Sequence, residues 1–100
     1  MIRGTTPKHV FSLPFATDEI AALRVTYAQR GVPLFSKTEA ECTLEGDGVT
    51  LSLSQEETLR FAAGDGVQIQ VRVLCKDGRA FASRVLAATV EDCLLEEVLE

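Results

Sequence analysis

The chain has 100 residues, enough for one small domain with its own hydrophobic core. Hydrophobic residues make up 46% and charged residues 25%, which is typical of a globular protein rather than a disordered one. The net charge of -5 disfavours binding to nucleic acid, and no apolar run approaches the ~20 residues that span a bilayer. The first residues also lack the apolar stretch of a secretory signal, so no membrane partner is expected.

Alternation of apolar and polar residues predicts several short strands in the first half of the chain. Residues 9–15 form the first, and Pro14, which has no N–H, places it at a sheet edge or ends it there. A hairpin is predicted for residues 23–29 and 32–37, with its turn at Gln29-Arg30-Gly31. Short strands at 42–45 and 49–53 flank the turn Gly46-Asp47-Gly48.

The second half of the chain begins with a helix signal and ends in strands. Ser54 and Glu57 have the spacing of a capping box, which predicts a helical turn near residues 55–60, with Leu59 and Phe61 directed to the core. Residues 67–75 alternate over nine positions and are the strongest strand prediction. After the turn at 76–79, residues 80–90 return as the last strand.

These elements predict an all-β protein: an immunoglobulin-like antiparallel β-sandwich of about seven short strands, with a helical turn and a short C-terminal helix or tail. The chain has no Trp, and its cysteines are not placed for an antibody-type disulfide. A five-stranded barrel is the alternative. We assign residues 1–90 to the sandwich domain and residues 91–100 to an acidic amphipathic tail.

No motif in the sequence predicts catalysis, a cofactor or a metal site. Phosphate-binding, nucleophile-elbow and zinc-protease signatures are absent. The three cysteines, Cys42, Cys75 and Cys93, have no C-x-x-C spacing and are expected as free, reduced thiols, with Cys75 buried. His9, the only histidine, is interpreted as an ordinary surface or edge residue. We therefore expect no enzyme activity, no cofactor, no metal and no small-molecule substrate.

The C-terminal ten residues stand apart in charge. They hold five acids and no base, while the rest of the chain has ten of each. Leu94, Leu95, Val98 and Leu99 are spaced to share one face of a short helix. One interpretation, which is favoured, is an end that packs on the body or frays. The other is a segment that docks on another chain through these four residues.

The chain also resembles a known family. The resemblance lies in these segments: Met-Ile-Arg-Gly-Thr-Thr-Pro (1–7), Phe-Ser-Leu-Pro-Phe (11–15), Leu-Arg-Val-Thr-Tyr-Ala-Gln (23–29), Cys-Thr-Leu-Glu-Gly (42–46), Leu-Ser-Gln-Glu-Glu-Thr-Leu-Arg-Phe (53–61), Val-Gln-Ile-Gln-Val-Arg-Val-Leu (67–74) and Cys-Leu-Leu-Glu-Glu-Val-Leu (93–99). In these it resembles a family of short proteins encoded in prophages and phages of gut Firmicutes. More loosely, it is similar to the N-terminal β-sandwich module of phage baseplate upper proteins.

This resemblance implies a structural or virion-associated protein-interaction module of a phage tail, baseplate or head. The partners it implies are other phage structural proteins and further copies of the chain, because a small sandwich leaves edge strands open to pairing. Such a protein would occur in the bacterial cytoplasm during assembly and in the virion. A phage-encoded regulator or inhibitor of a host bacterial protein is the alternative, and an enzyme subunit is a third. The family supplies no catalytic residue.

Overall fold

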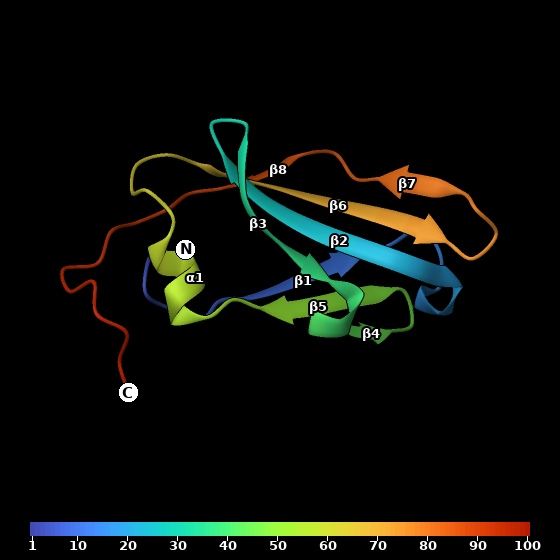
Figure 1. Ribbon diagram of the computed structural model, residues 1–100, viewed down its shortest axis with the longest axis horizontal. Coiled ribbons are helices and arrows are strands. Elements are labelled where there is room, and N and C mark those ends of the chain that lie inside the picture. Colours follow the sequence, from blue (N-terminus) through green and yellow to red (C-terminus); the bar gives the residue numbers. More distant parts are fainter.

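Two antiparallel sheets pack face to face in the computed structural model, which describes residues 1–100 (Figure 1). The smaller sheet has the order β1-β5-β4, with bounds Lys8–Ser12, Gly48–Ser52 and Thr43–Glu45. In the larger sheet β3 pairs with β2, β2 with β6, and both β7 and β8 with the far side of β6. Its strands are β2 (Ile20–Gln29), β3 (Val32–Thr38), β6 (Val67–Cys75), β7 (Ala80–Ala82) and β8 (Leu86–Ala88). The predicted all-β sandwich is confirmed, with eight strands.

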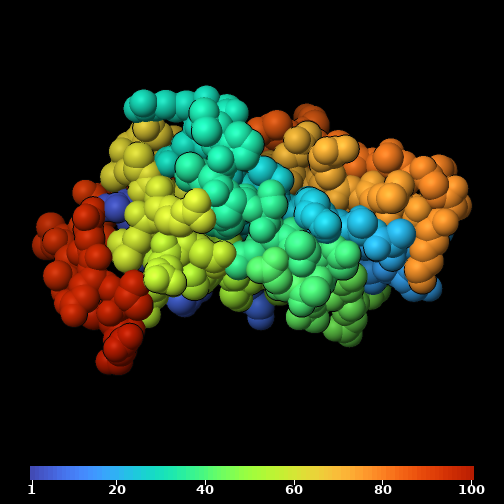
Figure 2. Space-filling view, in the orientation of Figure 1, coloured from blue at the N-terminus to red at the C-terminus, as the bar shows by residue number.

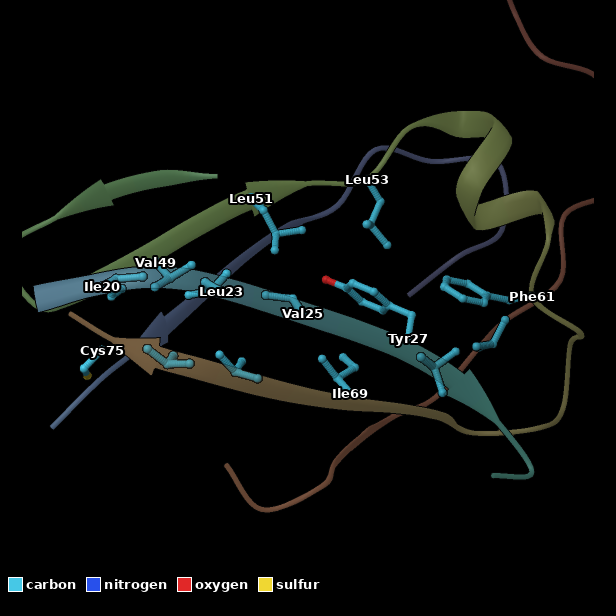
Figure 3. Close-up of a cluster of buried hydrophobic side chains, with 14 residues drawn as sticks. Ile20, Leu23, Val25, Tyr27, Val49, Leu51, Leu53, Phe61, Ile69 and Cys75 are labelled. Atoms are coloured by element: carbon cyan, nitrogen blue, oxygen red, sulfur yellow. The ribbon is translucent and has the colours of Figure 1, made fainter. Parts of the chain in front are cut away.

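The core lies between the sheets and follows the alternation of the sequence. β2 and β6 pair along most of their length, and each turns every second side chain inward (Figure 3). β5 contributes Val49 and Leu51 from the opposite sheet. The buried hydrophobic residues form one cluster: Ile20, Leu23, Val25, Tyr27, Val49, Leu51, Leu53, Phe61, Val67, Ile69, Val71, Val73, Cys75 and Val90.

Three short helical segments connect the strands. Two are 3-10 turns, η1 at Thr17–Glu19 and η2 at Glu39–Glu41. The third, α1, spans Gln55–Leu59, and the predicted capping box opens it: Ser54 Oγ accepts from the Glu57 N–H, and Glu57 accepts from the Ser54 N–H. Phe61 is buried as expected. Leu59, however, is only half-buried, and Thr58 takes the fully buried position.

Two predicted strands are shorter than expected. The first ends at Ser12, two residues before Pro14. Residues 80–90 form two short strands because Ser83 interrupts the ladder: its N–H donates to Val71 O at 2.8 Å, and its hydroxyl accepts from the Val71 N–H at 3.0 Å. A side-chain oxygen thus replaces a backbone partner, and the chain bulges outward between β7 and β8.

The C-terminal tail, residues 91–100, forms no helix. Apart from a single bridge at Glu91 it has no regular secondary structure. The helical face predicted from the spacing of its apolar residues is therefore wrong. The chain ends in a tail, the other form that the sequence allows.

Candidate functional site

The tail begins at a fixed point beside the N-terminus. The Glu91 N–H donates to Met1 O, and the Arg3 N–H donates to Glu91 O, each at 2.9 Å. The terminal ammonium of Met1 donates to Thr89 O at 2.6 Å. These bonds tie the two ends of the chain together, so the tail leaves the body from one defined position.

Arg3 anchors the next part of the tail. Its guanidinium donates to Asp92 at 2.6 Å and to Glu96 at 2.5 Å, and its other terminal nitrogen donates to Leu59 O at 2.9 Å. The Arg3 side chain is only 12% exposed, whereas both carboxylates are largely exposed. Hydrogen bonds from Arg3, and then from the Cys93 N–H, hold the pKa of Asp92 below its usual range.

Gly4 sets the course of the N-terminal arm beside the tail. Its φ of +80° belongs to the left-handed region that favours glycine, whereas the space at Cys93 Sγ, 3.7 Å from a Cβ there, would admit a side chain. The Gly4 N–H donates to the buried Thr58 hydroxyl at 2.9 Å. Helix α1 therefore positions the arm, and the arm in turn positions the tail.

A single glutamine holds the far end of the tail. The Gln55 side-chain amide donates to Leu99 O at 3.1 Å and accepts from the Leu99 N–H at 2.8 Å. Residues 92–100 make no backbone–backbone hydrogen bond. The hydrogen bonds that fasten the distal tail thus all involve side chains, and their tail-side carboxylates are exposed, so each bond is weak and reversible.

The four predicted interaction residues lie in this tail. Leu94 is fully exposed, Leu95 is 61% exposed, and Val98 and Leu99 are also exposed. Figure 2 shows the tail as a separate lobe at one end of the molecule, beyond α1. The four side chains are close in sequence, but they do not join the hydrophobic core. Their role in docking stays a prediction.

The sequence did not predict two polar contacts inside the sandwich. Lys37 is buried on β3, and its Nζ lies 2.5 Å from Glu57 of α1 and 3.6 Å from Glu41. His9 is an edge residue, as expected, but its Nδ1 is 2.7 Å from the hydroxyl of the buried Tyr27, on which its ring stacks. Burial raises the pKa of Tyr27. The sequence could have indicated that Lys37 is buried, because alternation places it on the same face of the strand as Phe35.

The cysteines are free thiols in the structure, with Cys75 buried and Cys42 and Cys93 half-buried. No three metal-binding side chains of His, Cys, Asp or Glu come together in a group. None of the helices is long and apolar enough to cross a membrane. Comparisons with protein-family models, curated proteins and solved structures find no match to this chain.

Proposed function

We propose that this chain is a phage structural or virion-associated protein-interaction module, and that its C-terminal tail is the segment that docks on another protein. The observation that carries the proposal is the combination in one short segment of four exposed apolar side chains, several carboxylates and no backbone ladder. Single exposed apolar residues are ordinary on a protein surface. Several of them grouped in one exposed segment are typical of an interaction site.

The tail has two properties that a docking peptide needs. Its base is fixed by backbone bonds at Glu91, so a bound tail would hold the sandwich in a defined position on the partner. Its distal half is hydrogen-bonded to the body through Arg3 and Gln55, and exposed bonds of this kind break at small cost. The apolar side chains would supply contact area, and the carboxylates would steer the approach to a basic partner.

The phage assignment rests on the family resemblance, and protein content of purified particles tests it. We expect mass spectrometry to find this polypeptide in purified virions in a fixed ratio to a known tail or head protein. The alternative is a phage-encoded regulator or inhibitor of a host bacterial protein. It predicts a chain that is absent from particles and recovered with one host protein instead.

A matched pair of substitutions tests the role of the tail. Leu95→Asp changes a predicted contact residue, and Val32→Asp changes a residue of the β2–β3 hairpin with the same exposure, 61%. We expect Leu95→Asp to lower the number of copies per particle at least about tenfold, since a charge would replace an apolar anchor in a desolvated contact. Val32→Asp should leave that number unchanged. Equal incorporation of the two variants would argue against docking through the tail.

A further inference from the structure

The outer face of the larger sheet carries a shallow trough. It has a volume of about 590 Å³ and lies across β2, β3, β6 and β7. We call it the arginine trough, because Arg24 of β2 and Arg72 of β6 are its only charged residues. Small side chains line much of it, and Leu74, 44% exposed, adds an apolar surface at one end. No part of the chain covers this face.

The positions of the two arginines lower the stability of the sheet. Arg24 and Arg72 are directly opposed partners in the β2–β6 ladder, and like charges at such positions repel. Arg24 is compensated by Glu39, whose carboxylate lies 2.8 Å from it. Arg72 forms no ion pair and no hydrogen bond through its side chain. The trough therefore presents an uncompensated positive charge beside apolar surface.

The C-terminal tail has the complementary chemistry. Arg3 already engages Asp92 and Glu96, whereas Glu97 and Glu100 form no ion pair. These two free carboxylates flank the exposed Val98 and Leu99. A segment with apolar side chains and unpaired acids matches a trough with apolar surface and an unpaired arginine.

We propose that the arginine trough of one copy receives the C-terminal tail of a second copy. This inference rests on the proposed function, since it identifies the partner of the docking tail. Docking breaks the two Gln55–Leu99 bonds and leaves the backbone anchor at Glu91 in place. Glu97 and Glu100 then face Arg72, and the apolar residues of the tail cover Leu74 and the small side chains around it.

The positions of the two surfaces determine the kind of assembly. Figure 1 shows the tail at one end of the long axis and the β6–β7 turn at the other, and the trough extends toward that turn. The tail and the trough are different surfaces, so each copy offers one of each to its neighbours. Two antiparallel copies that exchange tails close into a dimer, whereas a one-way contact repeats into rings or filaments.

Charge reversal on each surface tests the proposal. The trough variant is Arg72→Glu, and the tail variant is Glu97→Lys with Glu100→Lys. Arg84→Glu is the matched control, because Arg84 is an exposed arginine outside the trough and its reversal changes the net charge equally. Arg72→Glu places a carboxylate opposite Arg24, so the variant should fold at least as stably as the parent chain. Thermal unfolding verifies this.

The measurement is the average mass in sedimentation at rising protein concentration. We expect the parent chain and Arg84→Glu to associate into dimers or larger assemblies, with weakening at high salt. Each variant alone should have a dissociation constant at least about tenfold higher. An equimolar mixture of the trough and tail variants should associate again, because each reversed surface then meets a complementary one.

Three results would overturn the proposal: a parent chain that stays monomeric up to about 1 mM, variants that associate like the parent chain, or a mixture with no recovery. Particle incorporation separates this inference from the proposed function. If Arg72→Glu enters particles like the parent chain while Leu95→Asp does not, the tail still docks, but on a different protein.

Discussion

Lys37 is the one lysine of this chain whose side chain lies inside the protein, and Glu57 neutralises it. Burial alone would raise the pKa of Glu57, but hydrogen bonds from Lys37 and from the Ser54 N–H outweigh burial and lower it. We predict that Glu57→Gln lowers the free energy of unfolding by about 1–3 kcal/mol, because it leaves a buried ammonium with only the more distant Glu41. Urea unfolding at neutral pH measures this.

The adjacent Glu56 provides the control for this ion pair. Its carboxylate is exposed and has no partner, so Glu56→Gln should change stability by no more than about 0.5 kcal/mol. The ion pair stabilises the fold fully above the pKa that Glu57 has in the unfolded chain, about 4.3. This stabilisation is lost as the pH falls through the lower pKa that Glu57 has in the folded protein. Coincident unfolding curves for the two variants would show that the ion pair contributes nothing.

His9 makes stability depend on pH in a second window. Burial of its ring, and then the nearby positive N-terminus, lower the pKa of His9 below its usual value. The unfolded chain therefore binds a proton more readily, and stability should decrease as the pH falls below about 6.5. Since the chain has no other histidine, His9→Gln should remove this slope between about pH 7 and 5.5. Denaturant unfolding at several pH values measures it, and an unchanged slope would contradict the assignment.

Among the elements, the C-terminal tail should be dispensable for folding. Deletion of residues 94–100 removes the exposed Glu96 carboxylate from Arg3 and breaks the Gln55–Leu99 bonds, but Arg3 keeps Asp92, and the backbone anchor at Glu91 remains. We predict a change of no more than about 1 kcal/mol in the free energy of unfolding, because contacts of this exposed kind contribute little. A loss above about 3 kcal/mol in urea unfolding would show that the tail is part of the core.

The long strands were predictable because their pattern is local. Residues 67–75 alternate over nine positions, and β6 has these bounds. The capping box at Ser54 was equally readable, because its two residues lie three positions apart. The break at Ser83 was not, since it depends on which hydroxyl reaches the Val71 N–H across a strand pair. The helix predicted for the tail does not form, because the spacing of apolar residues alone cannot supply the backbone bonds and packing that a short helix needs.

The candidate site was predictable only in part. Leu94, Leu95, Val98 and Leu99 stand out in the sequence by their position beside the acids. The anchorage by Arg3 and Gln55 spans 89 to 93 and 44 residues of chain, so no local pattern indicates it. The arginine trough is hidden for the same reason: Arg24 and Arg72 become neighbours only through the register of β2 and β6.

At the scale of the whole molecule, shape and charge are both asymmetric. The molecule is elongated, with extents of 47 × 29 × 16 Å, and its net negative charge is concentrated at the end that carries the tail. A tail of four apolar residues gives a small contact. In the many-copy particle that we propose, weak contacts would act together, so each one need not bind tightly.

The most direct test of the docking tail is a count of copies per particle. The chain lacking residues 94–100 is supplied as the only form during phage assembly, and quantitative mass spectrometry compares its copies per particle with those of the full-length chain. We predict that the truncated protein folds but is depleted from particles at least about tenfold, since its apolar anchors are gone. Equal numbers of truncated and full-length copies per particle would contradict the claim that the tail docks this protein.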